Sequence, residues 1–261
     1  MAENQNIPEV QPIEIPAPVV GDKAGKRNWK SYFKEFLMLF LAITLGFFVE
    51  NKREEIIERD IEQTYMKTML EDLKSDTLQL SQNLELRQKR VNIIDSLIFL
   101  FSLSDYSKNL NDIYYLGRNI SLSIDFFPND RTIVQLKSSG GLRLVRNTDV
   151  SNSIMSYDQK MRLFFFQLTH EQQIRSEYRK FASIIFNGIV FNNMVEDSDI
   201  IKRPSNNPPL FSTDRQSINE LINYAQYLKK LDYNQIKRAG ELKRQGSDLI
   251  IHINKAYHLA K

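Results

Sequence analysis

Apolar residues recur at steps of three and four along three long parts of the chain, which is the spacing of one face of an α-helix. The first part runs from Tyr32 to Ser104, and it contains no proline and, after Gly46, no glycine. At 1.5 Å per residue this predicted helix is on the order of 100 Å long. A stripe that long and narrow needs helix partners, from the same chain or from another copy.

Selected positions of this first helix fall on two faces. The inward stripe consists of Ile57, Ile61, Tyr65, Met69, Leu73, Thr77, Leu80, Leu84, Val91, Ile94, Ile98 and Phe101. The solvent-facing side carries Glu54, Glu58, Arg59, Glu71, Lys74, Arg87 and Lys89. We therefore expect all of these charged groups to be solvated.

The remaining chain predicts two further long helices, several short elements and one long loop. The long helices begin at Thr148 or Asp149 and at Arg215, the latter capped by Thr213 or Asp214, and they end near Phe186 and Leu259. The short elements are a helix from Asn109 to Asn119, a strand-like alternation from Ile120 to Asp125, and a helix capped by Asn129 or Asp130 that closes at Gly140 and Gly141. Residues 187–213 are rich in proline and asparagine and predict a loop, of which residues 189–191 reach the core.

The fold class that follows is all-α. An N-terminal transmembrane helix is expected to continue into an elongated antiparallel helical bundle with coiled-coil-like packing. Nine glycines and eight prolines in 261 residues also favour long uninterrupted elements over a turn-rich β fold. The predicted domains are a disordered cytoplasmic tail over residues 1–30, a transmembrane helix over 31–50 and an exported helical domain over 51–261.

The run from Phe36 to Val49 is a long stretch without a charged residue, and nearly all of its residues are apolar. Its fourteen residues span only about 21 Å, but an extension back to Tyr32 gives roughly 27 Å, close to the 30 Å hydrocarbon core of a bilayer. Lys34 can then extend to the interface, and Glu35 lies near the edge, where a carboxylate reaches water. The alternative is a buried core helix. A cleaved signal peptide fits poorly, because more than thirty residues precede the run and no Ala-x-Ala site follows it.

The charges that flank this run predict its orientation. Residues 1–22 carry four prolines and no lysine or arginine, which indicates a disordered tail or a short docking motif. Five cations follow directly before the run: Lys23, Lys26, Arg27, Lys30 and Lys34. On the other side, acids outnumber bases in residues 50–55. The positive-inside rule then keeps the N-terminus in the cytoplasm and exports the C-terminal bulk to the periplasm, with the helix in the inner membrane.

The charge balance and the lack of cysteine argue against several classes of function and site. The 35 basic and 32 acidic residues give a net charge of +3, which argues against a general nucleic-acid binder. The absence of cysteine excludes disulfides, thiolate zinc sites and cysteine nucleophiles.

No catalytic, cofactor-binding or metal-ligating residues are predicted. His170 and Glu171 resemble the start of a metalloprotease helix motif, but position 174 is isoleucine where a second histidine is required. His252 and His258 are six residues apart, so they do not share a helical face. Ser138 to Gly141 lacks the Lys-Ser/Thr pair of a phosphate loop and is better explained as a helix end. The cluster of Glu54, Glu55, Glu58 and Glu62 lacks the Glu-x-x-His pairs of a di-metal bundle, so we expect a solvated face.

Two further groups of residues leave alternatives open. Phe164, Phe165 and Phe166 point in too many directions for one buried stripe, so part of this group faces the core and part another subunit, a lipid surface or the first helix. The charged residues around the central turn either bind an anion or cap and pair with each other: Asp130, Arg131, Arg143 and Arg146.

Four segments in this order resemble one family of proteins. They are Lys34-Glu35-Phe36 at the start of the apolar run, residues 50–55 (Glu-Asn-Lys-Arg-Glu-Glu) after it, residues 126–147 with their Leu-Lys-Ser-Ser-Gly-Gly-Leu-Arg-Leu-Val-Arg-Asn sequence, and residues 248–254 (Asp-Leu-Ile-Ile-His-Ile-Asn). The combination is similar to the uncharacterised single-span membrane proteins common in Bacteroidota, over most of residues 30–258. The resemblance implies a single-pass envelope protein and no assigned activity, and the proline-rich tail is longer than the family leads us to expect.

Three functions are consistent with the sequence. The first is a non-enzymatic, single-pass membrane protein whose periplasmic helical domain is a scaffold or binds a protein partner or another copy through the long helix. The second is a periplasmic ligand sensor coupled to a separate signalling partner. The third is a soluble α-helical enzyme in which residues 36–49 form a core helix.

Overall fold

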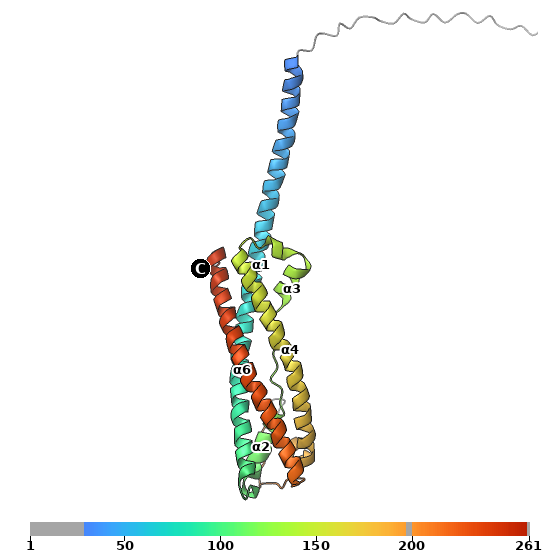
Figure 1. The fold of residues 1–261 in the computed structure, drawn as a ribbon, viewed down its shortest axis with the longest axis vertical. Helices are drawn as coiled ribbons and strands as arrows, with labels where there is room; N and C mark the ends of the chain where they lie inside the picture. The colour runs from blue at the N-terminus through green and yellow to red at the C-terminus, as the bar shows by residue number, and fades with distance from the viewer. Residues whose placement is uncertain (1–28, 197–199, 260–261) are drawn as a thin grey trace, which may run out of the picture. The chain divides into compact units, whose positions relative to one another are not determined.

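The computed structural model describes residues 29–196 and 200–259, and most of these residues are helical (Figure 1). Six α-helices are present in this part of the chain: α1 (Trp29–Ser102), α2 (Leu110–Ile120), α3 (Arg131–Ser138), α4 (Thr148–Ile185), α5 (Gly188–Asn193) and α6 (Arg215–Tyr257). Two short 3₁₀ turns, Ser107–Asn109 and Gly141–Leu144, lie between them. The all-α prediction is confirmed, and the bounds of the three long helices lie within a few residues of those predicted.

The chain divides into two compact units, one up to Glu55 and one from Ile56 onward. Helix α1 supplies all described residues of the first unit and one of the long helices of the second. The predicted disordered tail and the cations Lys23, Lys26 and Arg27 lie outside the described residues.

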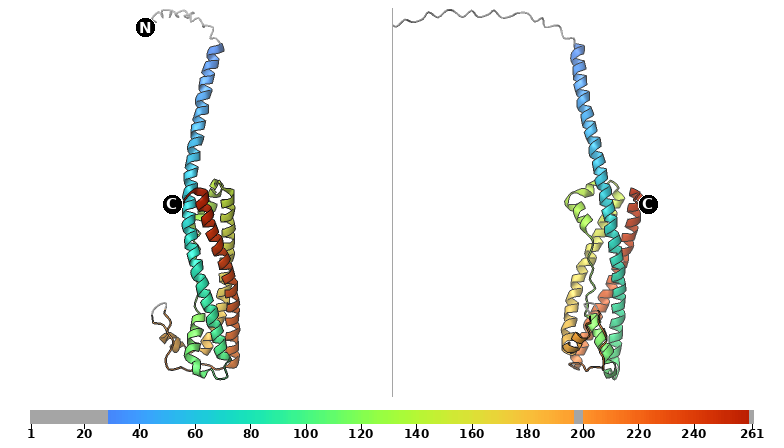
Figure 2. Two further views of the ribbon diagram at one scale, coloured as in Figure 1. Left: turned by 90° about the vertical axis from the view of Figure 1, so that its left-hand side faces the viewer. Right: turned by 180° about the vertical axis from the view of Figure 1, so that it is seen from behind.

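In the second unit, α1, α4 and α6 lie side by side (Figure 2). Contacts between α1 and α4 advance together along both helices, from Asp76 with Tyr157 to Arg87 with Glu171, so these helices run in the same direction. The contacts of α6 with α1 run in the opposite order, so α6 is antiparallel to both. The parallel pair arises because residues 121–130 carry the chain back along the bundle before α3 and α4 begin.

Two hydrophobic clusters fill the bundle. One combines α1 from Met66 to Leu80 with the N-terminal half of α4 and the C-terminal half of α6. The other combines the end of α1 from Ile94 with α2, the C-terminal half of α4 and the N-terminal half of α6. The coiled-coil-like geometry stays a prediction, but most buried positions of the three helices are spaced three or four residues apart.

Local chemistry explains where several helices begin. The carboxylate of Asp214 accepts a hydrogen bond from Ser217 N at 2.8 Å, and the side chain of Asn147 accepts one from Val150 N at 3.0 Å, so each caps its helix. The expected Asp214 cap is therefore present. Helix α3 is different, because Asp130 forms no side-chain cap; instead Asp72 on α1 accepts from Thr132 N at 3.1 Å.

Several local predictions are wrong. Ile120–Asp125 is not a strand: Ile120 ends α2, and the next residues form a turn and an extended return segment. Ile57 and Ile61 are exposed, because α4 and α6 cover α1 only beyond them. In the 187–213 loop, Val190 and Phe191 do pack against the core, but Ile189 is exposed.

Candidate functional site

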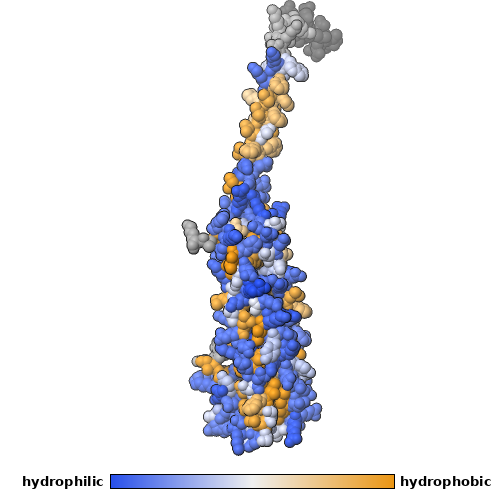
Figure 3. All heavy atoms as spheres, turned by 60° about the vertical axis from the view of Figure 1, so that its left-hand side comes forward, coloured by the Kyte–Doolittle hydropathy of each residue, from blue (hydrophilic) through white to orange (hydrophobic). Residues whose placement is uncertain are grey.

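The apolar segment of α1, residues 36–49, is exposed along its whole length. All eleven of its large apolar residues expose more than two fifths of their surface: Phe36, Leu37, Met38, Leu39, Phe40, Leu41, Ile43, Leu45, Phe47, Phe48 and Val49. Figure 3 shows a largely hydrophobic surface on this segment. By length and composition, α1 is the one helix among residues 29–196 and 200–259 that can cross a membrane, and none of its most apolar part is buried.

Polar groups within and beside this segment are satisfied locally. Thr44 Oγ1 donates to Phe40 O at 2.7 Å, which leaves no hydroxyl without a partner in the middle of the apolar surface. Beyond Val49, the exposed pairs Lys52–Glu55 (2.8 Å) and Arg53–Glu50 (3.1 Å) form within one turn of the helix. The apolar surface therefore ends sharply at a band of charged residues.

The predicted acidic cluster separates into exposed and buried members. Glu54 is exposed and Glu58 is half-buried, but Glu62 is buried, so the expectation of a solvated face is wrong for Glu62. Its Oε1 accepts from Arg146 N at 2.7 Å and from the Tyr257 hydroxyl at 2.5 Å. Burial, together with the bond to Glu62, raises the pKa of Tyr257. Glu62 thus connects α1 to the residues just before α4 and to the C-terminal end of α6.

The charged residues around the central turn do not converge on one site. Arg131 Nε donates to Asp72 at 2.7 Å and its Nη2 to Glu71 at 2.9 Å, both on α1. The Arg146 guanidinium lies 3.5 Å from Glu58, also on α1. Arg131 and Arg146 therefore pair with acids of α1 and not with one another as predicted, and anion binding stays a prediction.

The most unusual feature of the bundle is a layer of five buried charged side chains. Arg87 and Arg90 come from α1, Glu171 and Arg175 from α4, and Asp232 from α6; Arg87 and Asp232 are 0% exposed and Glu171 is 2% exposed. Arg87 Nη1 donates to Glu171 at 2.8 Å and to Asp232 at 2.7 Å. Arg90 donates to Asp232 through Nε at 2.7 Å and through Nη2 at 2.6 Å, and to Glu171 at 2.6 Å.

This polar layer separates the two hydrophobic clusters. On α1 it falls between Leu80 and Ile94, on α4 between Phe164 and Tyr178, and on α6 it precedes Ala239. Asn83 Oδ1 accepts a further hydrogen bond, from Arg87 Nε at 2.7 Å. Each of the three long helices therefore carries buried charged residues between its contributions to the two clusters.

Opposing effects set the protonation of the layer. Burial raises the pKa of Glu171, but the neighbouring Arg90 and Arg87 outweigh it, so the net pKa is lowered and the carboxylate is ionised at neutral pH. Burial is also the largest influence on Arg90, yet its bonds to Asp232 and Glu171 raise its pKa. Arg87 Nη2 and the side-chain amide of Gln235 are buried without a hydrogen-bond partner in the described part of the chain.

The apolar pattern did not predict this layer, and the prediction that Arg87 faces solvent is wrong. The signal was present in the spacing. The buried residues of α1 from Leu73 to Leu97 follow steps of three and four, and Arg87 and Arg90 occupy two of those steps. Asp232 likewise follows Leu228 by four residues on α6. Arg87 had been assigned to the solvent-facing side because it is charged.

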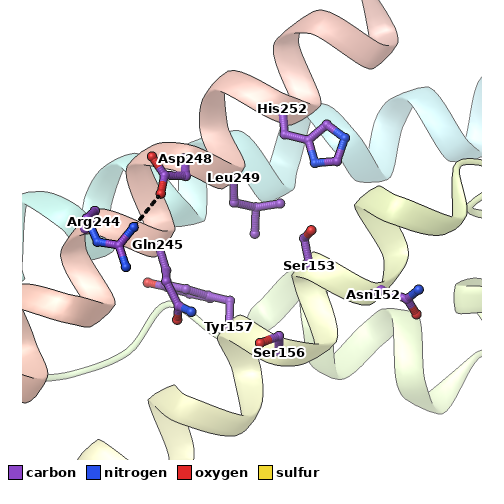
Figure 4. A pocket seen from close by; sticks show the side chains of 9 residues that line it. All are labelled: Asn152, Ser153, Ser156, Tyr157, Arg244, Gln245, Asp248, Leu249 and His252. Carbon is purple, nitrogen blue, oxygen red and sulfur yellow. Dashed lines mark hydrogen bonds and ion pairs between the residues drawn. The ribbon is translucent and has the colours of Figure 1, made fainter.

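A cavity of about 390 Å³ lies between α4 and α6 (Figure 4). Ser153 and Ser156 line it from α4, and Asp248 and His252 line it from α6, which together resemble the parts of a hydrolytic triad. Ser153 and Asp248, however, interact with residues of their own helices. Ser153 Oγ donates to Asp149 O at 2.7 Å, and Asp248 lies 3.4 Å from Arg244. This cavity is a polar pocket without an assembled nucleophile–base pair.

The remaining residues considered as candidates lie at separate places in the structure. His170 is exposed, whereas the adjacent Glu171 belongs to the buried layer. The described residues contain no group of three or more histidine, aspartate or glutamate side chains that could hold a metal ion. Of the three phenylalanines, Phe164 is buried in the core, and Phe165 and Phe166 are exposed.

Comparison with known proteins found no matching family model, no matching curated protein and no matching solved structure.

Proposed function

We propose that this protein is a non-enzymatic, single-pass membrane protein, held in the inner membrane by residues 31–50, with a periplasmic helical bundle that is a scaffold or binds a protein partner. The observation that carries the proposal is the apolar segment of α1, whose large side chains are all exposed. Burying an apolar side chain of this size is favourable by about 1.5–3 kcal/mol. Eleven uncovered side chains on one segment therefore favour a hydrocarbon environment.

Charge asymmetry supports the orientation. Lys23, Lys26, Arg27, Lys30 and Lys34 precede the apolar segment, whereas residues 50–55 hold three acids and two bases. Lysine and arginine near the end of a span favour the cytoplasmic side. The two bases after the span are also paired with Glu55 and Glu50.

The bundle supports a structural role, because most of its buried charged groups are engaged with one another. Glu62, Asp72 and the polar layer connect α1 to α3, α4 and α6 through short hydrogen bonds. Such groups fix the register of helices, and their side chains are already occupied by structural partners.

We propose that the exposed Ile57 and Ile61 on α1 contact the protein partner or a second copy of the chain. Replacing both with serine is expected to abolish co-purification of the partner or to shift the oligomeric state in light scattering. The matched control replaces Thr64 and Lys67, exposed residues of the same helix, and is expected to leave the assembly unchanged. Unchanged assembly in the Ile57→Ser/Ile61→Ser variant would contradict this contact.

A pair of C-terminal reporter fusions tests the topology. Alkaline phosphatase, which is active only after export, is expected to be active, and green fluorescent protein, which fluoresces only in the cytoplasm, is expected to be dark. Replacing the five cations before the span with glutamine, and Glu50, Glu54 and Glu55 with lysine, is expected to exchange the two signals. A fluorescent, phosphatase-negative fusion of the unaltered chain would refute the orientation.

A further inference from the structure

A small cavity lies against the charged layer, on the side formed by α4 and the return segment 121–130. It encloses about 110 Å³. Its walls are mainly apolar and include Ile124, Phe126 and Leu168, while Glu171 and Arg175 supply charge. An apolar cavity with a few polar groups converging on it is the usual form of a small-molecule site.

Arg175 lines this cavity, and most of its hydrogen-bond donors have no partner among the described residues. The residue is 4% exposed. A guanidinium has five N–H donors. The one hydrogen bond that it donates within the described residues runs from Nη1 to Glu171 Oε1 at 3.0 Å. Glu171 meanwhile also accepts from Arg87 and Arg90, so Arg175 shares its acid with two other cations.

The charges of the layer do not balance. Three buried guanidiniums, Arg87, Arg90 and Arg175, face two buried carboxylates, Glu171 and Asp232. Burial lowers the pKa of Arg175 and outweighs the opposing effect of Glu171; Arg90 and Arg179 add to the lowering, and Asp125 opposes it weakly. An uncompensated buried charge is costly, and a bound anion removes that cost.

The described residues offer one further acid here, and it does not complete the balance. Asp125 lines the cavity but is exposed and forms no ion pair in the described part of the chain. Arg179, on the same helix, donates instead to the backbone oxygen of Ser121 at 2.9 and 2.6 Å. Arg175 is therefore left as the cation that faces the cavity.

We propose that this cavity binds a small organic monocarboxylate, whose carboxylate pairs with Arg175 and whose short aliphatic chain fills the space beside Phe126 and Leu168. An arginine fork matches a carboxylate in two parallel hydrogen bonds. The volume sets the size of the ligand. A 150 Å³ cavity accommodates benzene with its six carbons, so 110 Å³ suits about four or five non-hydrogen atoms. Acetate and propionate have that size.

The test is a titration of the full chain in detergent micelles with sodium propionate, followed by saturation-transfer NMR of the propionate methyl group. Sodium chloride keeps the ionic strength constant. Propionate is expected to bind saturably, and propanamide, which has the same number of heavy atoms and no charge, is expected to bind at least about tenfold more weakly. Equal binding of the two, or no saturable binding of propionate, would overturn the proposal.

Two variants and one control assign the binding to Arg175. Arg175→Gln keeps the Arg87 and Arg90 contacts of Glu171 and is expected to weaken propionate binding at least about tenfold. The control is Arg162→Gln, which removes an exposed arginine of α4 paired with Asp158, and is expected to bind propionate as the unaltered chain does. Unchanged affinity in Arg175→Gln would refute the assignment.

Asp125→Asn keeps the test decisive if Arg175→Gln does not fold. Asp125 is exposed, so the fold is expected to tolerate the change. Removing a carboxylate that competes for Arg175 is expected to tighten propionate binding by about two- to fivefold. If Asp125 were itself the partner of Arg175, the variant would lose stability without binding propionate more tightly, and that result would overturn the proposal.

Discussion

Replacing Asp232 with asparagine tests whether the buried layer holds the three long helices together. Asp232 is 0% exposed and accepts three hydrogen bonds from two arginines, at 2.6 to 2.7 Å. The substitution keeps the size of the side chain and removes its charge. Arg87, Arg90 and Arg175 would then share Glu171 alone.

The expected loss follows from the burial of the pair. Removing one partner of a buried ion pair costs about 3–5 kcal/mol, because the other charge stays buried without compensation. Asp248→Asn on the same helix is the matched control, since Asp248 lies 3.4 Å from Arg244 and both side chains are more than 60% exposed. An exposed pair of this kind contributes less than about 1 kcal/mol.

Urea unfolding of the full chain in a mild non-ionic detergent, followed by circular dichroism at 222 nm, measures both variants. Asp232→Asn is expected to lower the free energy of unfolding by at least about 2 kcal/mol more than Asp248→Asn does. In a thermal scan the Asp232→Asn loss corresponds to roughly 6–20 °C for a bundle of this size. Equal losses in the two variants would refute the claim that charge compensation in the layer stabilises the bundle.

Two further predictions concern packing and pH. Gly240→Ala is expected to raise the free energy of unfolding by about 1 kcal/mol, because a Cβ there meets nothing within 4 Å. Gly246→Ala is expected to give no gain or a loss, because its Cβ would lie 2.9 Å from Thr77 Cγ2. Equal gains in urea unfolding would contradict the close approach of α6 to α1. Because the pKa of Glu171 is lowered in the folded state, its contribution to stability is full above the ordinary value of 4.5 and is lost as the pH falls through the folded-state pKa. Burial raises the pKa of Asp76, so Asp76 changes the stability in the opposite direction with pH. Unfolding between pH 7 and pH 3 measures this slope, and Glu171→Gln is expected to make it shallower; an unchanged slope would contradict the assignment.

The long helices could be predicted from the sequence because the spacing of their apolar residues is nearly unbroken. α1 was expected from Tyr32 to Ser104 and is found from Trp29 to Ser102. The start of α6 followed from Asp214, whose short carboxylate reaches the first free backbone N–H groups of the helix. These features depend on residues near one another in the sequence, which is why periodicity and caps predict them.

The candidate site depends on residues far apart in the sequence, and the pattern alone did not predict it. Arg87 meets Glu171 and Asp232 across 84 and 145 residues. Its burial follows from the joint spacing of three helices, whereas its charge suggests solvent. The direction of α4 was missed for a related reason. Residues 120–125 alternate as a strand does, but no second strand is present among the described residues to pair with them, and the segment instead returns the chain along the bundle.

Alkaline carbonate extraction of bacterial membranes tests the central claim, that the apolar segment of α1 anchors the protein, most directly. The unaltered chain is expected to stay in the membrane pellet. Leu41→Asp/Leu45→Asp costs about 3 kcal/mol per substitution in the bilayer and is expected to move the protein to the supernatant. Leu163→Asp/Phe166→Asp changes exposed apolar residues of the bundle and is expected to stay in the pellet. Extraction of the unaltered chain, or retention of the Leu41→Asp/Leu45→Asp variant, would contradict the account.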